Sequence, residues 1–554
     1  MKKTIPMGHV LLTGATGLLG HFLMRDALVA DQPLVVLTRD RKTNSARERI
    51  EQDVLAWEER LQRFLPRPVV IAGELSESGI GVDSSDASWI SRHCETVLHS
   101  AASVRFYADS QTQEPYRTNL DGTRHLLEFC RRHRIVHFHH VSTAYVCGQR
   151  DGDVWEMQLD AGQAFGNDYE RSKFHAELLV RHADFLESAT IYRPSIIVGE
   201  LATGRTTTFH GYYTPLQLAW FAFQGPTEFP DTSNWFLQQL GLDGDEGKNL
   251  VPVDWVASVI GKIVEDRRRW GSTYHLTNPQ ATSVRQMLDS MSQAINDALA
   301  KRSQGNGQRQ TPSVDVAPAA ILAGVDFRQQ MEPYRAYFRN DPTFHQDALA
   351  EADVPACPVL ERDDLVRTAR FAIASGFQRP RSPQAGNSFA EDLLSQAVAE
   401  HLSLARGGDD DDDGADLHAL ATMSAIQFQV LGPGGTTCYL EYADDTPMRL
   451  FHGTEPHATG TVVTRLDILR QLLAGQLGWD QAIVSGHCVV WAEPISEAKE
   501  TGVDALPSSG SNLASPAELE IGPAMQTLMR RLRRLCEPVE AMASLALTHK
   551  ANGR

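Results

Sequence analysis

A tyrosine and a lysine four residues apart, Tyr169 and Lys173, have the types and the spacing for proton transfer. On a helix, residues four apart share one face, so the phenol and the ammonium group would lie together. An isolated phenol titrates near pH ~10, and a neighbouring ammonium group favours the phenolate and lowers that pKa. The pair therefore predicts general acid–base catalysis, with an ordinary surface helix pair as the structural alternative.

A hydroxyl group is the natural companion of such an acid, because it can hydrogen-bond a substrate carbonyl. Ser142 and Thr143 follow an apolar segment, residues 135–141, that is predicted to be a strand. The carboxyl ends of parallel strands present functional side chains, so either hydroxyl could act beside Tyr169. Capping of the strand end is the structural alternative.

Three glycines with dinucleotide-binding spacing occur near the start of the chain, in Thr-Gly-Ala-Thr-Gly-Leu-Leu-Gly. Gly14 would allow a tight turn, Gly17 a close approach to pyrophosphate, and Gly20 close helix packing. The loop lies between a predicted strand, residues 10–12, and a predicted helix, residues 21–28. A helix N-terminus after the loop would offer unpaired N–H groups to phosphates, so we expect a dinucleotide site.

The residues after the second predicted strand, residues 35–38, indicate which dinucleotide binds. The NAD-specific acidic residue expected there is replaced by Thr38 and then Arg39, with Arg41 close behind. Arginine suits a 2′-phosphate because its planar fork donates twice to phosphate oxygens. Asp40 falls beyond the strand end. The sequence therefore favours NADP.

The elements that would position these residues alternate between strand and helix. This alternation predicts an α/β fold with a doubly wound parallel sheet. Residues 301–308 are expected to form a surface loop. The expected strands cover residues 69–72, 96–99, 189–192 and 249–253 besides those named above, and a charged helix covers 45–64.

The C-terminal part has a different pattern, beyond a Pro/Gly/Arg-rich segment at residues 378–388 that is expected to be a linker. Alternating apolar residues on both sides of a glycine-rich turn predict a hairpin, so the tail is expected to be an α+β domain. The aspartate run 409–413 is expected to be a solvated loop. The expected elements are helices over 389–404, 467–473 and 516–547, the last with a basic patch at 530–534, and strands over 426–430, 438–442, 461–464 and 488–491.

Composition limits the function classes. The 554 residues are 42% hydrophobic and 22% charged, which is typical of a globular protein with more than one domain. A formal charge of −18 disfavours nucleic acid as a partner. The seven cysteines contain no Cys-x-x-Cys pair, so neither a disulfide framework nor a metal site is expected. With no signal-peptide pattern and no membrane-length apolar segment, we expect a cytoplasmic protein.

These motifs together resemble the extended short-chain dehydrogenase/reductases. The carriers of the resemblance are the glycine loop, Ser142-Thr143-Ala144, Tyr169 with Lys173, and Arg193-Pro194-Ser195. Further segments resemble the thioester reductase and fatty acyl-CoA reductase branch, also called male-sterility-like, over about residues 8–375. They are the 45–64 helix, Ala72-Gly73-Glu74-Leu75-Ser76, Gly79-Ile80-Gly81-Val82, His99-Ser100-Ala101-Ala102-Ser103-Val104, Asn119-Leu120-Asp121-Gly122-Thr123 and the 251–257 segment.

The resemblance implies site roles and an activity. It implies that Thr143, Tyr169 and Lys173 are catalytic and that Lys173 also holds the nicotinamide ribose. Glu74 stands where an aspartate is more usual. The implied NADP contacts are Gly14, Thr16, Gly17, Leu18, Leu19, Gly20, Arg39, Glu74, Leu75, Ala101, Ala102, Lys173, Pro194 and Ser195.

The activity implied is NADPH-dependent reduction of an acyl thioester, on coenzyme A or a carrier protein, to an aldehyde. Two alternatives remain: an NADP-dependent alcohol or ketone dehydrogenase acting on a lipid or sterol, and a non-catalytic lipid-binding or redox-sensing protein. The tail resembles the sterol carrier protein fold, which holds lipid chains in an apolar tunnel. The expected division is a reductase domain over 1–377, the linker over 378–388, and a sterol-carrier-like domain over 389–554.

Overall fold

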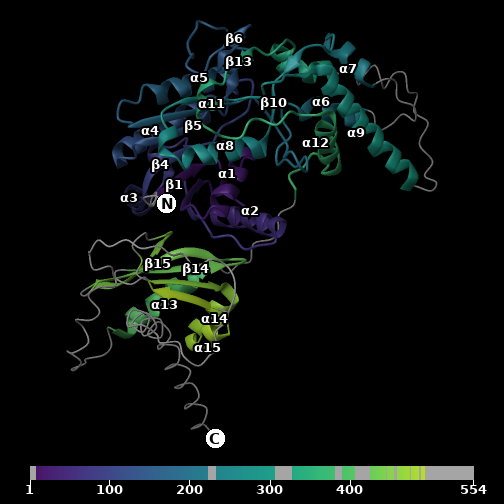
Figure 1. The fold of residues 1–554 in the computed structure, drawn as a ribbon. Helices are drawn as coiled ribbons and strands as arrows, with labels where there is room; N and C mark the ends of the chain where they lie inside the picture. Colours follow the sequence, from purple (N-terminus) through teal and green to yellow (C-terminus); the bar gives the residue numbers. More distant parts are fainter. Residues whose placement is uncertain are drawn as a thin grey trace.

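The computed structural model describes residues 8–222, 232–305, 327–380, 390–405, 425–443, 446–454, 458, 460–474, 476–485 and 488–492. A seven-stranded sheet, in which every neighbouring pair is parallel, forms the centre of the N-terminal part (Figure 1). Its order is β11-β7-β5-β4-β1-β2-β3. The strands are β1 (His9–Thr13), β2 (Leu34–Thr38), β3 (Val69–Ala72), β4 (Cys94–His99), β5 (His137–Val141), β7 (Ser188–Pro194) and β11 (Thr273–Leu276).

Helices cover both faces of this sheet, which confirms the predicted doubly wound α/β fold. Alternate residues of β1 show why: Val10 and Leu12 belong to one buried cluster, and Leu11 belongs to another on the opposite face. Strands buried on both faces are rich in apolar residues, as β1 and β2 are, whereas β5 carries three buried histidines. The covering helices are α1 (Leu18–Val29), α2 (Ala46–Leu61), α3 (Ser84–His93), α4 (Gly122–His133), α5 (Asp168–Arg181) and α8 (Val253–Val264).

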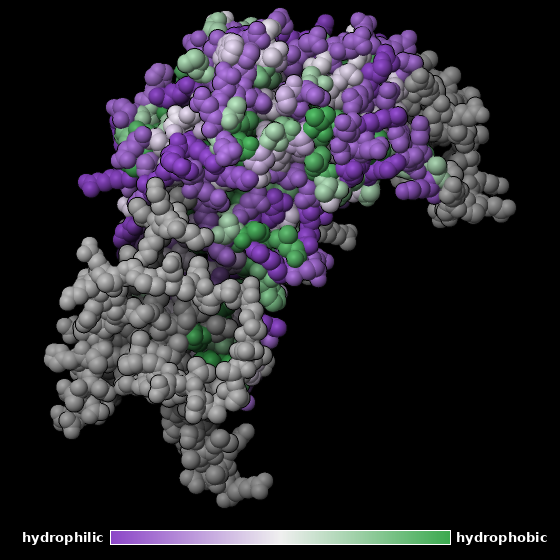
Figure 2. All heavy atoms as spheres, viewed as in Figure 1, coloured by the Kyte–Doolittle hydropathy of each residue, from purple (hydrophilic) through white to green (hydrophobic). Residues whose placement is uncertain are grey.

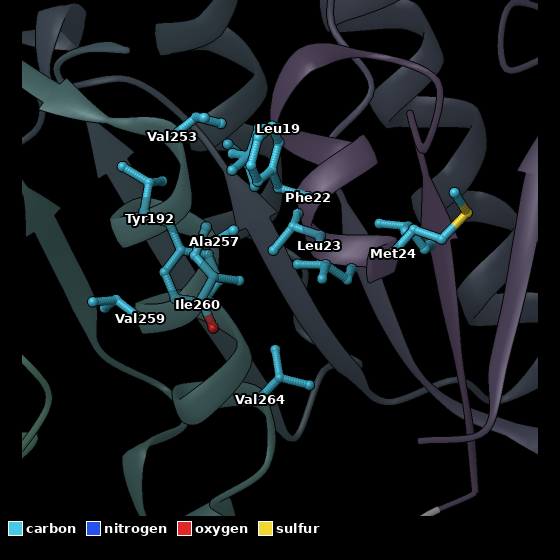
Figure 3. Packing of buried hydrophobic residues seen from close by; sticks show 14 of the residues in the cluster. Leu19, Phe22, Leu23, Met24, Tyr192, Val253, Ala257, Val259, Ile260 and Val264 are labelled. Atoms are coloured by element: carbon cyan, nitrogen blue, oxygen red, sulfur yellow. The ribbon is translucent and has the colours of Figure 1, made fainter. Parts of the chain in front are cut away.

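The helix that follows the glycine loop is held by tight apolar packing. Leu19, Phe22 and Leu23 of α1 point toward Ala257 and Ile260 of α8 (Figure 3). All five side chains are buried. Burying side chains of this size contributes about 1.5–3 kcal/mol each, so the start of α1 is fixed against the sheet.

A second group of elements packs beside the carboxyl ends of the strands and has its own buried cluster. Its longest helix runs to Gly305, so residues 301–305 are helical, where the sequence predicted a loop over 301–308, and residues 306–308 lie outside the described residues. Lysine, arginine and glutamine favour helix, and the first glycine in this stretch is residue 305. The elements are β8 (Ile196–Val198), β10 (Leu250–Pro252), β9 (Gly247–Lys248), β12 (Thr282–Ser283), β6 (Asp153–Val154), β13 (Thr343–Phe344), α6 (Tyr213–Ala222), α7 (Thr232–Leu240), α9 (Val284–Gly305), α11 (Asp347–Glu351) and α12 (Arg362–Ala374).

The described residues from 390 to 492, called the C-terminal unit below, form a five-stranded sheet with helices on one face (Figure 1). The predicted hairpin is confirmed as β14 paired with β15, but β16 was not expected. Its sequence contains a proline, Pro447, which β16 tolerates because it lies at the edge of the sheet. The elements are β14 (Ala425–Leu431), β15 (Thr436–Ala443), β16 (Thr446–His452), β17 (Gly460–Arg465), β18 (Cys488–Ala492), α13 (Ala390–Ala405), α14 (Leu466–Leu473) and α15 (Trp479–Val484), in the sheet order β16-β15-β14-β17-β18.

Several predictions fall outside the described residues: the aspartate run 409–413, the helix 516–547 with its basic patch, and the linker beyond residue 380. Within the described ranges, no helix is both long and apolar enough to cross a membrane. The described surface of the N-terminal part is largely hydrophilic in Figure 2, with apolar residues in small patches.

The C-terminal unit contacts the amino ends of the strands in the parallel sheet. Arg67, just before β3, is buried and forms ion pairs with Glu51 and Glu58 of α2. The same guanidinium donates to the carbonyl oxygen of Gly432 (2.7 Å), and the N–H of Gly434 donates to Glu51 (2.8 Å). The turn between β14 and β15 is therefore anchored to a buried ion network.

Candidate active site

The glycine loop connects β1 to α1 at the carboxyl end of the sheet. Gly14 has φ +78°, and a Cβ there would lie 2.6 Å from the backbone nitrogen of Ala101. A Cβ on Gly20 would lie 2.1 Å from the carbonyl oxygen of Gly14, so its close contact is with the loop itself. Gly17 is the N-cap residue of α1 and has no side chain to bind the N–H groups of the first turn, and no hydrogen bond to them from another side chain occurs among the described residues. Those N–H groups therefore remain available to a phosphate.

The loop lies where the strand order reverses, between β1 and β4. Ligands of open α/β sheets bind at this switch point, beyond the carboxyl ends of the strands. A cavity of about 920 Å³ opens here. Gly14, Gly17, Leu18, Leu19 and Gly20 all line it, as the sequence predicted for the loop.

The three candidate catalytic side chains line the same cavity. Thr143 follows β5, while Tyr169 and Lys173 lie on α5, whose first turn is capped by the side chain of Asn167. The Thr143 hydroxyl lies near that of Tyr169 and lowers its pKa, and it donates to the carbonyl oxygen of Pro194 (3.4 Å). Ser142 was the alternative hydroxyl, and it donates instead to a buried carboxylate, Glu177 (2.7 Å). The geometry thus favours Thr143 as the partner of Tyr169.

Burial shifts the pKa values of both titratable groups. It raises the pKa of Tyr169 to about 12, and the neighbouring Thr143 hydroxyl opposes this shift. It lowers the pKa of the Lys173 ammonium from 10.5 to about 8. Lys173 does not contribute to the pKa of Tyr169, which departs from the expected lowering by the ammonium group. Its Nζ donates instead to the carbonyl oxygen of Val141 (2.7 Å).

A buried ion network beneath these residues was not anticipated as a unit. Glu177, one turn after Lys173, pairs with Arg193 of β7 (2.7 Å) and with Arg181 (2.9 Å). Glu177 and Arg193 are 0% and 1% exposed. The network joins three elements: Ser142 follows β5, Glu177 lies on α5, and Arg193 lies on β7. It therefore fixes the backbone that carries Thr143 and Tyr169. The Arg-Pro-Ser motif in the sequence was its one signal.

The remaining predicted contacts divide into two groups. Ala102, Pro194 and Ser195 line the cavity, and the Ser195 hydroxyl is buried without a hydrogen-bond partner in the described part of the chain. Thr16, Arg39, Glu74, Leu75 and Ala101 lie outside the cavity lining. The N–H of Ala101 donates to Thr13 (3.3 Å), the carbonyl oxygen of Leu75 is hydrogen-bonded by His125 (3.0 Å), and Arg39 pairs with Glu74 (3.4 Å).

A group of arginines lies at the end of β2, beside the glycine loop. The guanidinium of Arg49 donates to the Thr16 hydroxyl (3.0 Å) and to the carbonyl oxygen of Arg39 (2.6 Å). Burial lowers the pKa of Arg49, and so do the charges of Arg41, Arg39 and Arg379. Arg49 and Arg379 were not predicted, because a helix face and a distant segment carry no local signal of what they approach.

Beyond the polar residues the cavity is largely apolar. This wall comes from the elements beside the carboxyl ends of the strands, and it was not predicted from the sequence. It includes Tyr107, Tyr213, Leu240, Met287, Met291 and Tyr334. Concave, mainly apolar cavities with a few convergent polar groups are typical of small-molecule sites.

These features fit a dinucleotide. The glycines allow a tight loop whose close backbone contacts a Cβ would prevent, the first turn of α1 offers N–H groups that its N-cap residue does not bind, and the Ser195 hydroxyl has no hydrogen-bond partner in the described part of the chain. The hydroxyl pair of Thr143 and Tyr169 stands at the same cavity, where a substrate carbonyl could accept hydrogen bonds beside the cofactor.

The chain is similar to a protein named as a synthase and to one named as an aldehyde reductase. It is 28% identical over 303 residues to the isonitrile lipopeptide synthase of Mycobacterium tuberculosis, covering 50% of this chain and 12% of that protein. It is 24% identical over 307 residues to the aldehyde reductase lnbA of Aspergillus flavus, covering 53% of this chain and 29% of that protein. The chain therefore spans less than a third of either relative.

Among solved structures, the chain is similar to the terminal R domain from the myxalamid PKS–NRPS biosynthetic pathway. The identity is 22%, the TM-score is 0.53, and the match covers 69% of this chain and 94% of that domain. This likeness supports the fold. The Male sterility protein family matches residues 12–260, which hold the glycine loop, Thr143, Tyr169 and Lys173. Residues 12–260, somewhat less than half of the chain, are therefore similar to the male sterility protein family, and this match supports a nicotinamide-cofactor-dependent oxidoreductase.

Proposed function

We propose that this protein is an NADPH-dependent reductase that converts an acyl thioester to an aldehyde. The observation that carries the proposal is that Thr143, Tyr169 and Lys173 line one largely apolar cavity together with the glycine loop. The family match and a relative named as an aldehyde reductase support a reduction. The male-sterility-like resemblance supports a thioester as the group reduced.

The chain's residues would supply the proton chemistry, while bound NADPH supplies a hydride. Thr143 and Tyr169 would both hydrogen-bond the thioester carbonyl oxygen, and Tyr169 would give it a proton as negative charge develops. The resulting hemithioacetal would collapse to aldehyde and free thiol. A positioned acid of this kind is typically worth about 10²–10⁴ in rate. Lys173 would hold the nicotinamide ribose and keep Tyr169 in place.

NADP in place of NAD is supported by the residues at the end of β2. Thr38 stands where a carboxylate would bind an unmodified ribose, and Arg39 follows it with 63% of its side chain exposed. Asp40 does not restore that carboxylate, since it accepts a hydrogen bond from the N–H of Ala46 at the start of α2 (2.7 Å).

The source of the acyl group is proposed from the relatives. A synthase and an R domain of a PKS–NRPS pathway are among them, which supports a carrier-bound thioester in preference to acyl-CoA. For the C-terminal residues we propose the division at a 378–388 linker and a sterol-carrier-like domain over 389–554. The layering of one sheet against α13, α14 and α15 supports this assignment.

The decisive experiment follows NADPH oxidation by the full chain with carrier-bound acyl thioesters, acyl-CoAs and ketones, and measures free thiol. Thioester-dependent oxidation with stoichiometric thiol release is expected. Oxidation with ketones alone would favour the alcohol or ketone dehydrogenase alternative, and no oxidation with any substrate would favour the binding protein. Tyr169→Phe should lower kcat about 10²–10⁴-fold with NADPH affinity retained. Tyr107→Phe, at the same cavity, is the matched control.

A further inference from the structure

Arg379 lies far from the glycine loop in sequence and contacts it directly. Its guanidinium donates to the carbonyl oxygen of Thr16 (3.0 Å) and pairs with the buried carboxylate of Asp53 on α2 (2.6 Å). Arg379 lies outside the part of the chain that the family matches, residues 12–260. It is also among the last described residues before the C-terminal unit.

The segment that carries Arg379 is held in place. It leaves α12 through Gly376 and Phe377, which have φ +63° and +56°. The Phe377 side chain is buried against Phe209 and within 6.2 Å of Phe221, measured between ring centroids. A buried aromatic residue two positions before Arg379 fixes where the guanidinium can reach, so its contact with the loop is built into the fold.

Two arginines from different elements therefore bind the same residue of the loop. Arg49 binds the hydroxyl of Thr16, and Arg379 binds its carbonyl oxygen. Among the described residues Arg49 has no carboxylate partner, and its three hydrogen bonds go to uncharged oxygens. The charge of Asp53, which pairs with Arg379, also attracts Arg49, but this one carboxylate only partly offsets the repulsion from the neighbouring arginines, and a bound anion would offset more of it.

The position of this arginine group indicates the anion. The group lies between Thr16, in the glycine loop, and the end of β2, where Arg39 follows Thr38. In this fold the end of β2 is where the adenosine ribose of a dinucleotide is bound. The planar guanidinium fork matches the geometry of phosphate oxygens and can donate to two of them at once.

We propose that Arg379 is a specificity-determining residue that binds the 2′-phosphate of NADP together with Arg39 and Arg49. The proposal rests on the proposed use of NADP. It assigns part of the cofactor site to the segment that leads into the C-terminal unit. Arg379 also links α2 to the loop through Asp53, so the same side chain stabilises the frame of the site.

The test compares two probes that differ only in the 2′-phosphate: adenosine 2′,5′-bisphosphate and adenosine 5′-monophosphate. Calorimetric titration of the full chain measures the affinity for each. Arg379→Ala should weaken the bisphosphate about 10–100-fold, as expected for charge-assisted hydrogen bonds, and leave the monophosphate unchanged. Arg379→Lys should retain most of the affinity. Arg268→Ala, a change at an exposed arginine, is the matched control.

A purely structural role predicts a different pattern. Arg379→Ala leaves Asp53 buried with one fewer partner, so the double variant Arg379→Ala/Asp53→Asn removes that charge as well. Loss of the 2′-phosphate preference in both variants supports the proposal. An equal loss for both probes, or no loss, overturns it.

The reference variant Arg39→Ala separates this inference from the proposed function. If the wild type prefers the bisphosphate and Arg39→Ala loses that preference while Arg379→Ala keeps it, only the role of Arg379 is wrong. If the wild type itself shows no preference between the probes, the assignment of NADP fails and the role of Arg379 fails with it.

Discussion

Replacing Lys173 by methionine should stabilise the folded protein at neutral pH and at the same time remove its proposed function. The ammonium group is buried, and burial lowers its pKa from 10.5 to about 8. Glu177 opposes that shift only in part, and the nearby His99 and His140 are neutral because burial and Lys173 lower their pKa values. The folded protein therefore holds the ammonium charge of Lys173 in a buried environment that disfavours it.

The magnitude follows from the pKa shift. A difference of about 2.5 pKa units corresponds to about 3 kcal/mol of folding free energy at pH 7. Methionine also loses the hydrogen bond to Val141, worth about 1 kcal/mol. We therefore expect Lys173→Met to raise the free energy of unfolding by about 2 kcal/mol at pH 7.

The pH dependence has a definite sign. The pKa of Lys173 is lower in the folded than in the unfolded protein, so between about pH 8 and 10.5 the unfolded state binds more protons and wild-type stability rises with pH. The penalty is fully present below the folded pKa and disappears as the pH passes the unfolded value. The advantage of Lys173→Met should shrink by about 2 kcal/mol between pH 7 and pH 10.

Urea unfolding of both proteins at pH 7, 8.5 and 10 measures this difference, and other titrating groups cancel in the comparison. Lys262→Met, a change at an exposed lysine of α8, should leave the free energy of unfolding within about 0.5 kcal/mol of the wild type. A Lys173→Met protein that is less stable than the wild type at pH 7 would refute the reasoning. So would a stability difference that does not change from pH 7 to pH 10.

Three further outcomes are expected from substitutions. Glu177→Gln should lower the free energy of unfolding by about 3–5 kcal/mol in urea titration, because it leaves Arg193 buried without its carboxylate. Arg67→Met should release the turn between β14 and β15, so limited proteolysis should cut between the two parts of the chain faster than in the wild type. Gly20→Ala should abolish NADPH binding in calorimetry, because its Cβ would meet a loop carbonyl oxygen at 2.1 Å, whereas Gly261→Ala has open space and should bind normally.

Each of these expectations has a contrary outcome. Wild-type stability of Glu177→Gln would mean that the buried network is dispensable. An unchanged cleavage rate in Arg67→Met would place the anchoring of the C-terminal unit elsewhere. Normal cofactor affinity in Gly20→Ala would remove the glycine loop from the cofactor site.

The sequence predicted the parts of the site that have local signals. Gly14 and Gly17 follow a strand and precede a helix, and that context is readable along the chain. Tyr169 and Lys173 are one turn apart, so their common face needed only a helix. Their catalytic roles, and that of Thr143, stay predictions.

What the sequence missed depends on tertiary contacts. Arg49 is one of several charged residues on α2, and only the folded helix shows that it reaches Thr16. The pairing of Glu177 with Arg193 joins a helix to a strand 16 residues away. The pKa of Tyr169 was expected to fall, but the expectation considered only the lysine and not the burial that raises it.

The attachment of the C-terminal unit has a consequence for how such a protein could evolve and be recombined. Its anchor, around Arg67, lies at the amino ends of the strands, whereas the cavity opens at their carboxyl ends. Because the C-terminal unit is attached at the amino ends, it leaves the cavity at the carboxyl ends open. The sequences of the C-terminal unit and of the apolar cavity wall can therefore diverge independently. The exception is the short segment that ends with Arg379. A graft of this C-terminal unit onto a related protein, or its removal, should therefore keep the native chain through residue 380.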